Sequence, residues 1–263
     1  MMMNNNTNIL HTKNLSIGYA SKKEVLTIAS NINISLTKGK LITLIGGNGI
    51  GKSTLLRTIT AIQTPISGDV ILNNKNIFSI ENSDLAQQQS LVLTDKLPSS
   101  NLTVWELIAL GRQPYTNWMG NLTDEDYTKI NTAVQLTNIE HLIEKKHYEI
   151  SDGQLQKVLI ARALAQDTDL IILDEPTTHL DLFHKVSVFK LLQKLAHESE
   201  KCILFSTHDI DLAIQLSDEM IVMTKENTIQ DQPCNLIEKG VFDTLFEDEN
   251  IIFDKEKGKF IVR

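Results

Sequence analysis

Residues 46–54 of this 263-residue chain constrain its fold more than any other stretch. They read Gly-Gly-Asn-Gly-Ile-Gly-Lys-Ser-Thr and fit the phosphate-binding loop pattern G-x-x-x-x-G-K-[ST]. Glycines let the backbone curl so that successive N–H groups point inward and form a nest for an anion. The lysine of this pattern reaches the β- and γ-phosphates, and the hydroxyl of the Ser or Thr after it ligates Mg²⁺. The sequence therefore predicts a polyphosphate site at Gly46, Gly47, Asn48, Gly49, Ile50, Gly51, Lys52, Ser53 and Thr54, with Ser53 as a magnesium ligand.

The segments on either side of this loop support the same interpretation. Residues 41–45 are Leu-Ile-Thr-Leu-Ile, which is typical of a buried strand that ends at the loop. Residues 53–62 predict a helix whose N-terminal end faces the phosphates, where the helix dipole favours negative charge. A strand, a phosphate loop and a helix in this order indicate an α/β fold.

Charge and composition exclude several classes of function. Lys plus Arg is 25 and Asp plus Glu is 33, which gives a formal net charge of -8. Nucleic-acid surfaces are basic, so we expect no nucleic-acid partner. The same acidity argues against direct adhesion to anionic lipid, and any membrane association should come through a protein partner.

Targeting and cysteine patterns favour the cytoplasm. No run of eighteen or more apolar residues predicts a transmembrane helix, and the first residues lack the apolar centre of a signal peptide. The cysteines are Cys202 and Cys234, which form neither a disulfide framework nor a zinc pattern.

The order of patterns along the chain predicts three kinds of structure. Residues 9–34 alternate in polarity and predict antiparallel strands with a loop near residues 20–24, and residues 69–74 predict one arm of a small hairpin. Residues 84–164 favour helices and predict an insertion between sheet strands. A capping box opens one of these helices at Thr103, and another helix starts at Thr123 and covers about residues 124–138. An aromatic loop at residues 113–122 either caps the core or forms a docking surface.

Two adjacent carboxylates follow a second buried strand. Residues 169–175 read Asp-Leu-Ile-Ile-Leu-Asp-Glu, and ligands bind at the C-terminal ends of strands in open α/β sheets. Beside a phosphate loop, such a pair indicates one carboxylate that helps to bind a metal ion and one that acts as a base. We expect Asp174 to hold Mg²⁺ through water and Glu175 to polarise an attacking water molecule.

Two further features allow both a structural and a functional interpretation, and a third is purely structural. Ser151 and Gln154 stand at capping-box spacing, and the same geometry lets a hydroxyl and backbone N–H groups face an anion. His208 follows a strand, where it is either structural or in contact with the terminal phosphate. A helix is predicted from residue 181 to residue 198, with a core-packing stripe at Leu182, Val186, Phe189, Leu192 and Leu195. Residues after 224 suggest no chemical role.

The order of these pieces resembles the nucleotide-binding subunits of ABC transporters over residues 9–224, with residues 225–263 as a C-terminal extension of unknown role. The matching motifs are Walker A at residues 46–54, the signature at residues 150–154 (Ile-Ser-Asp-Gly-Gln for LSGGQ), Walker B with the catalytic glutamate at residues 170–175, the D-loop at residues 178–181 and the switch histidine His208. The resemblance implies a P-loop NTPase (RecA-like) core with an antiparallel β subdomain and an inserted helical subdomain at about residues 84–164.

The resemblance also implies how such a subunit works. Two copies pack head to tail, and each ATP lies between Walker A of one copy and the signature of the other. The nucleotide contacts implied on the signature side are Ser151, Asp152, Gly153, Gln154 and the D-loop residue Asp181, and Tyr19 fits the aromatic residue that stacks on adenine. Glu175 and His208 are the implied catalytic residues. ATP-driven closure then moves transmembrane permease subunits, which receive cargo from a substrate-binding protein, so the chain would be peripheral at the cytoplasmic face of the membrane.

One position departs from the family pattern. The family has a glutamine where the strand enters the helical subdomain, and it contacts Mg²⁺ and signals to the permease. Counting back from Thr103 puts Thr94 or Asp95 at that position. The Asp95 carboxylate is a possible metal ligand.

Within the family, residues 107–114 with Trp118 and Gly120 resemble importers of iron-siderophore, haem or cobalamin type. The alternatives are a soluble ABC ATPase without a permease and the ATPase of an exporter. A single Walker A motif and the lack of a long coiled-coil insertion argue against the soluble class.

Overall fold

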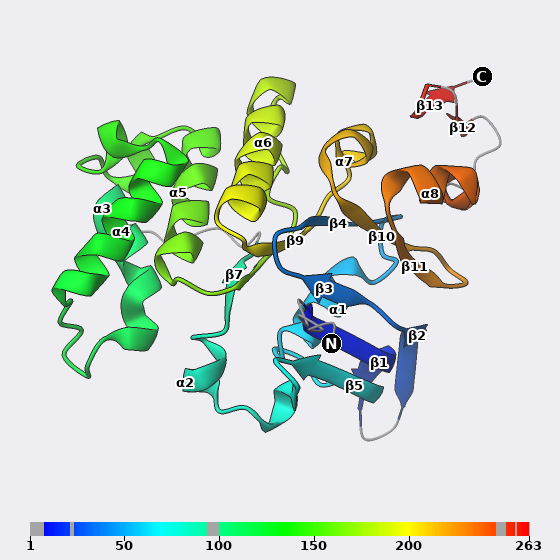
Figure 1. The fold of residues 1–263 in the computed structure, drawn as a ribbon, viewed down its shortest axis with the longest axis horizontal. Coiled ribbons are helices and arrows are strands. Elements are labelled where there is room, and N and C mark those ends of the chain that lie inside the picture. Colours follow the sequence, from blue (N-terminus) through cyan, green and yellow to red (C-terminus); the bar gives the residue numbers. More distant parts are fainter. Residues whose placement is uncertain (1–7, 22–23, 94–99, 246–250, 256, 263) are drawn as a thin grey trace, which may run out of the picture.

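The computed structural model describes residues 8–21, 24–93, 100–245, 251–255 and 257–262. Its centre is a six-stranded sheet with the strand order β11-β10-β4-β9-β8-β7 (Figure 1). These strands are β4 (Leu41–Gly46), β7 (Gln89–Val92), β8 (Leu170–Leu173), β9 (Cys202–Ser206), β10 (Glu219–Met223) and β11 (Thr228–Asp231). All neighbours pair in parallel except β11, which is antiparallel to β10. The C-terminal ends of β4, β8 and β9 therefore meet at one edge of the sheet.

The central strands are buried on both faces, as their continuous apolar sequences predict. Successive side chains of a strand point to opposite faces, so one strand contributes to two interiors. In β4, Leu41 and Ile45 pack in one hydrophobic cluster, whereas Ile42 and Leu44 pack in the other. Each such side chain contributes about 1.5–3 kcal/mol when it is fully buried.

A second, antiparallel sheet covers one of these interiors, as residues 9–34 and 69–74 predict. Its strands are β1 (Asn8–Ala20), β2 (Val25–Ile32), β3 (Ser35–Thr37), β5 (Ser67–Leu72) and β6 (Lys75–Asn76). The order is β2-β1-β5-β6, with β3 paired to β1. Asn73 and Asn74 join β5 to β6 with positive φ angles of 47° and 66°, the conformation that tight hairpins require.

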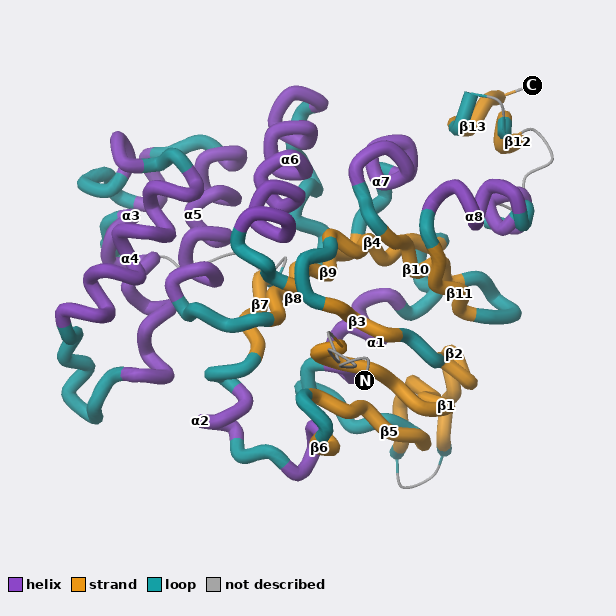
Figure 2. The backbone as a smooth tube through the Cα atoms, viewed as in Figure 1, coloured by secondary structure: helices purple, strands orange, loops and turns teal. Residues whose placement is uncertain are grey.

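Helices cover both faces of the central sheet (Figures 1 and 2). On the side of the antiparallel strands lies α1 (Lys52–Ile59), which ends three residues before the predicted Ile62. On the other side lie α6 (Leu182–Glu198) and α7 (Ile210–Leu216). The stripe predicted on α6 is buried at Phe189, Leu192 and Leu195, but Leu182 is 69% exposed. The prediction is wrong for Leu182 because it lies in the first turn of α6, where Phe183 is exposed too.

Residues between β7 and β8 form a separate group of helices, drawn in green in Figure 1. They are α3 (Val104–Ala109), a 3₁₀ segment (Leu110–Tyr115), α4 (Asp124–Thr137), two short 3₁₀ turns (Glu140–Leu142 and His147–Glu149) and α5 (Asp152–Ala165). The predicted capping box at Thr103 is present, and Thr123, the predicted start of the next helix, forms a capping box as well. The range 84–164 also includes the end of α2 (Asn82–Leu85) and β7, and β7 belongs to the central sheet. Within the aromatic loop, Trp118 is 93% exposed and so does not cap the core.

A buried ion pair holds these helices together. Arg112 Nε lies 2.7 Å from Asp126 Oδ1, and Arg112 Nη1 donates to the carbonyl oxygen of Ala165 at the end of α5. Burial raises the pKa of Asp126, but hydrogen bonds from Thr123 and Arg112 outweigh this effect and hold the pKa below its ordinary value. The charged pair therefore links the start of α4 to the last turn of α5.

The C-terminal residues add to the fold rather than trail from it. They form α8 (Pro233–Glu238), a 3₁₀ segment (Val241–Thr244) and the hairpin β12 (Ile251–Asp254) and β13 (Lys259–Val262). The Phe242 ring stacks on Phe253 with a centroid distance of 4.8 Å, and Phe253 contacts Phe260 edge-on at 5.0 Å. This aromatic cluster fixes the hairpin at the end of the molecule opposite the helical group (Figure 1).

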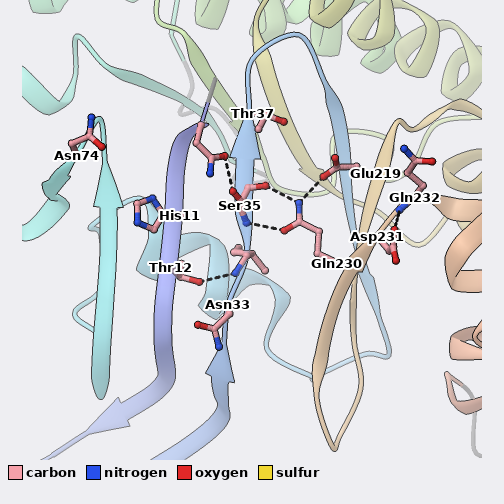
Figure 3. A pocket seen from close by; sticks show the side chains of 12 residues that line it. His11, Thr12, Asn33, Ser35, Thr37, Asn74, Glu219, Gln230, Asp231 and Gln232 are labelled. Atoms are coloured by element: carbon pink, nitrogen blue, oxygen red, sulfur yellow. Dashed lines mark hydrogen bonds between the residues drawn. The ribbon is translucent and has the colours of Figure 1, made fainter. Parts of the chain in front are cut away.

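A polar cavity of about 800 Å³ marks the junction of the two sheets (Figure 3). The Gln230 side chain spans it: Oε1 accepts from the backbone N–H of Ser35, and Nε2 donates to the Ser35 carbonyl and to Glu219. Ser35 Oγ in turn donates to Asn8. These hydrogen bonds satisfy the polar groups of Ser35 and Gln230 and link β3 to β11.

Candidate active site

The loop of residues 46–54 joins β4 to α1 and curls around the Lys52 side chain. Lys52 is only 6% exposed, and its ammonium group donates to the carbonyl oxygens of Gly46 (2.9 Å) and Gly47 (3.2 Å). Burial lowers the pKa of Lys52, while the nearby carboxylates of Glu175 and Asp174 oppose that shift. The loop therefore holds a cation on its inner side.

The start of α1 is built for an anion. Gly51 has a φ of 111°, and a Cβ added there would lie 2.7 Å from Ile28 Cγ2, so only glycine fits. No side chain caps the helix, and its first turn contains no acidic residue. The first N–H groups of a helix have no partner inside it, so they are free to bind phosphate oxygens.

Tyr19, Ser53 and Thr54 lie beside this helix start. The Tyr19 hydroxyl is 3.4 Å from Thr54 Oγ1, while about half of the Tyr19 side chain is exposed. Thr54 is buried, and Ser53 is partly exposed on the same turn. An exposed ring next to the phosphate loop is available to stack on a flat ligand.

Ser206 at the end of β9 holds the two acidic residues that follow β8. Its Oγ donates to Asp174 Oδ1 (2.6 Å) and accepts from the backbone N–H of Glu175 (2.8 Å). The N–H of Asp174 donates to the carbonyl oxygen of Val92 in β7. Three parallel strands thus fix Asp174, which is 9% exposed, at the edge where β4 delivers the loop.

Glu175 has an unusual backbone and a fixed side chain. Its φ of 48° lies in the left-handed region, which costs free energy for a residue with a Cβ. One carboxylate oxygen lies 2.7 Å from His208 Nε2, and the other accepts from Thr178 Oγ1 at 3.1 Å. A carboxylate held in this way can accept a proton from water, and the imidazole of His208 can orient the carboxylate.

Asp209 secures the segment that carries His208. Its carboxylate accepts from Thr177 Oγ1 (2.9 Å) and from the Lys185 ammonium group on α6 (2.6 Å). The sequence predicted no site role for Thr177, Ser206 or Asp209, and it placed Thr178 only in the D-loop motif. The available signal was the cluster of short hydroxyl and acidic residues directly after β8 and β9.

The predicted signature residues lie at the start of α5. Ser151 caps the helix, accepting from the Gln154 N–H, and Gln154 Oε1 accepts from the Ser151 N–H. Asp152 is exposed at the first helical position, where negative charge is stabilised, and Gly153 is buried.

Asp181 caps the neighbouring helix α6. It accepts from the His184 backbone N–H (2.9 Å) and lies 2.8 Å from His184 Nδ1. Two hydrogen bonds from His184 lower the pKa of Asp181, and the one from the backbone N–H has the larger effect.

The structure thus gathers the candidate residues into two groups. Lys52, Asp174, Glu175 and His208 lie at the edge of the central sheet, and these candidate catalytic residues are called the catalytic group below. The residues Ser151, Asp152, Gly153, Gln154 and Asp181 form a signature group at the starts of α5 and α6. No hydrogen bond joins the two groups within the described part of the chain. Asp95 and Thr94 lie outside the described residues.

Comparison with known proteins identifies the family. The family model described as ABC transporter matches residues 29–178, more than half of the chain. The chain belongs to the ABC transporter family. The iron(3+)-hydroxamate import ATP-binding protein FhuC of Bacillus subtilis is 37% identical, over 96% of this chain and 93% of that protein. The achromobactin transport ATP-binding protein CbrD of Dickeya dadantii is 37% identical, over 89% of this chain and 86% of that protein.

Solved structures agree with this assignment. A chain from an inward-facing conformation of a metal-chelate type ABC transporter aligns with a TM-score of 0.79 at 28% identity, over 97% of this chain and 95% of that one. A dimeric ATP-binding cassette bound to ADP and phosphate aligns with a TM-score of 0.72 at 25% identity, over 86% of this chain and 99% of that one. The fold is therefore that of a P-loop NTPase, and the protein is an ATP-binding ATPase of an ABC transporter. Within the described residues, no helix is long and apolar enough to cross a membrane.

Proposed function

We propose that this chain powers the import of a metal chelate of the iron-siderophore class. The named relatives support this cargo class, because they serve hydroxamate and achromobactin transport. The metal-chelate type transporter supports it independently through its structure.

The observation that carries the mechanism is that, in the described residues of one chain, no hydrogen bond joins the signature group to the catalytic group. A complete site then needs a second copy, in which the signature group of one chain faces the catalytic group of the other. The dimeric form of a related cassette supports this arrangement. In the proposed dimer, Ser151 and Gly153 act on the nucleotide of the partner copy, and Asp181 lies at the contact between the copies.

The residues of the catalytic group fit ATP and Mg²⁺. The uncapped start of α1 and the buried Lys52 suit the phosphates, and Tyr19 suits the adenine ring. Ser53 and Asp174 would hold Mg²⁺, which neutralises charge on the β- and γ-phosphates when bound. No group of three or more His, Cys, Asp or Glu side chains gathers as a metal site in the described ranges. This agrees with Mg²⁺, which commonly uses one or two protein oxygens together with phosphates.

Glu175 and His208 perform the hydrolytic step in this proposal. Glu175 accepts a proton from the attacking water, and the hydrogen bond to Thr178 keeps its carboxylate in place. His208 exchanges its contact with Glu175 for one with the terminal phosphate when the two copies close. The 2.7 Å contact in the single chain supports a switch between these two partners.

A groove on the same chain suits the permease. It has a volume of about 450 Å³ and lies between the end of α1, α2 and β7, next to the exposed Ile62. A small crevice lined by Ile62, Leu93 and Asp174 lies beside this groove, so Asp174, the proposed magnesium ligand, lies near it. A cytoplasmic segment of the permease that binds here would sense and influence the position of Asp174. This arrangement would make the chain a peripheral subunit at the cytoplasmic face of the membrane.

Purification of the tagged protein from native membranes in mild detergent tests the proposal. We expect a many-helix permease to co-purify, and we expect Ile62→Glu to lose the permease while it keeps ATP binding. Stimulation of ATP turnover in the purified complex by a binding protein loaded with ferric hydroxamate would support the cargo class. Recovery of the protein only in the soluble fraction, alone or with ribosomes, would contradict the transport function.

A further inference from the structure

We propose that His184 is a positioning residue that locks the signature segment (residues 151–154) to the D-loop (residues 178–181) of the same chain. The two segments would then meet the second copy as one rigid surface. This inference rests on the two-copy arrangement of the proposed function.

The His184 ring packs directly against Gly153. A Cβ added to Gly153 would lie 2.6 Å from His184 Cδ2 and 3.0 Å from His184 Cγ. Gly153 is buried although its neighbours Ser151 and Asp152 are exposed. The imidazole therefore covers the backbone at the start of α5, and only glycine allows so close a contact.

The same ring binds the end of the D-loop. His184 Nδ1 lies 2.8 Å from Asp181 Oδ1, the oxygen that also accepts the His184 backbone N–H. The backbone bond alone would cap α6, as it does at helix starts in general. The second bond fixes the orientation of the imidazole, and through it the position of Gly153 relative to Asp181.

The surroundings of His184 point toward a partner surface. Phe183 contacts the imidazole edge-on with a centroid distance of 5.5 Å, and Leu182 and Phe183 are both largely exposed. Two exposed apolar residues beside the D-loop suit a surface that a second copy covers. His184 thus lies where a small rotation of α6 would move Asp181 and the signature segment together.

Two substitutions separate the two contacts of the ring. His184→Asn keeps a donor for Asp181 but removes the cover over Gly153, and His184→Phe keeps the cover but removes the donor. The matched control is His197→Asn, because His197 also lies on α6 and pairs with an aspartate, Asp218, at 2.9 Å. The parent is the Glu175→Gln variant, in which slow hydrolysis preserves the ATP-bound dimer.

The measurement is the ATP-dependent dimerisation constant by analytical ultracentrifugation, with ATP affinity determined at concentrations where the chain is monomeric. We expect both His184 variants to weaken dimerisation tenfold or more with monomer ATP affinity unchanged, and His197→Asn to match the parent. The inference would be overturned if the parent dimerises and the dimerisation constants of both His184 variants lie within twofold of its constant. That result would leave the proposed function intact. A parent that stays monomeric with saturating ATP would overturn the two-copy arrangement and this inference with it.

A double-mutant cycle on the unfolding of the monomer tests the contact without a dimer. Gly153→Ala should lower the unfolding midpoint in the parent, and His184→Ala should relieve most of that loss because it removes the ring that the new Cβ meets. Strictly additive effects of the two substitutions would show that the ring does not pack on Gly153 and would overturn the inference.

Discussion

The catalytic group and the signature group are built in opposite ways. In the catalytic group, Lys52 and Asp174 are almost fully buried, and hydrogen bonds with residues of β4 and β9 hold their side chains, whereas His208 is exposed. In the signature group, Ser151 and Asp152 are exposed, and Ser151 and Gln154 bond mainly to each other.

This contrast separates binding from assembly. In the proposed function, the catalytic group would hold a nucleotide in a single chain, because Lys52 and Asp174 are buried and the central sheet fixes their geometry. An exposed helix start has no ligand of its own, so its chemistry begins only when another surface reaches it. Substitutions in the two groups should therefore affect different measurements.

The largest expected effect is on turnover in the catalytic group. Glu175→Gln removes the proton acceptor, so we expect ATP turnover to fall about a thousandfold, as is typical for loss of a general base. ATP affinity should stay near that of the wild type, and a stable dimer should form with ATP. Phosphate release and size-exclusion chromatography measure the two effects. An unchanged turnover rate would remove Glu175 from the role of base.

The next effect concerns the stability of the helical group that presents the signature. Arg112→Ala leaves the Asp126 carboxylate buried without its cation, which should cost roughly 3–5 kcal/mol of unfolding free energy. Urea unfolding measures this loss, and Lys194→Ala, which breaks an exposed pair with Glu198 on α6, is the control. A loss below 1 kcal/mol would mean that Arg112 does not anchor α5.

The same pair gives a pH dependence of known sign. Hydrogen bonds hold the pKa of Asp126 below its ordinary value despite burial, so the ionised group stabilises the fold above pH about 4. That contribution is lost as the pH falls through the lowered pKa. The stability difference between wild type and Asp126→Asn should therefore shrink as the pH falls below about 4. A difference that stays constant down to pH 3 would contradict the assignment.

Substitution of Lys52 tests whether the catalytic group alone binds ATP. Lys52→Ala should weaken ATP binding by the monomer about a hundredfold, or roughly 2.7 kcal/mol, because a buried cation facing the phosphates is lost. Isothermal titration calorimetry measures the change. Lys38→Ala, which breaks a surface pair with Asp169, should leave the affinity unchanged. Equal affinities of Lys52→Ala and wild type would contradict the phosphate site.

The smallest effect should separate the two groups most sharply. Ser151→Ala should leave ATP binding by the monomer unchanged and lower turnover about tenfold, which corresponds to 1.4 kcal/mol. It also removes a helix cap, worth about 1 kcal/mol of stability. Thr103→Ala removes a similar exposed cap from α3 and is the control for that loss. Weaker ATP binding by monomeric Ser151→Ala would mean that the two groups are not independent.

Local features of this fold were predictable from the sequence, and contacts between distant residues were not. The phosphate loop, the helix caps and the buried strands depend on neighbouring residues, so short patterns reveal them. Ser206 binds Asp174 and Glu175 from more than thirty residues away, and no spacing rule links them. The contact of His184 with Gly153 likewise arises only when the starts of α5 and α6 meet in the folded chain.

Two regions illustrate the physical limits of the patterns. The apolar stripe on α6 predicted a buried Leu182, but periodicity cannot tell where the neighbouring structure ends. Residues after 224 lack periodicity, although Phe242, Phe253 and Phe260 form a compact cluster there. Clusters of a few aromatic residues depend on a turn that brings them together, which the sequence pattern does not specify.

Side chains of β4 alternate between the two hydrophobic clusters, and this alternation limits changes in the length of β4. Deletion of one residue from β4 would exchange the faces of Leu41 and Ile45 with those of Ile42 and Leu44 in both clusters at once. It would also draw the phosphate loop back from Asp174 by about 3.3 Å, the rise of one strand residue. Insertions and deletions should therefore accumulate in the surface turns of this family member, while the length of β4 stays fixed.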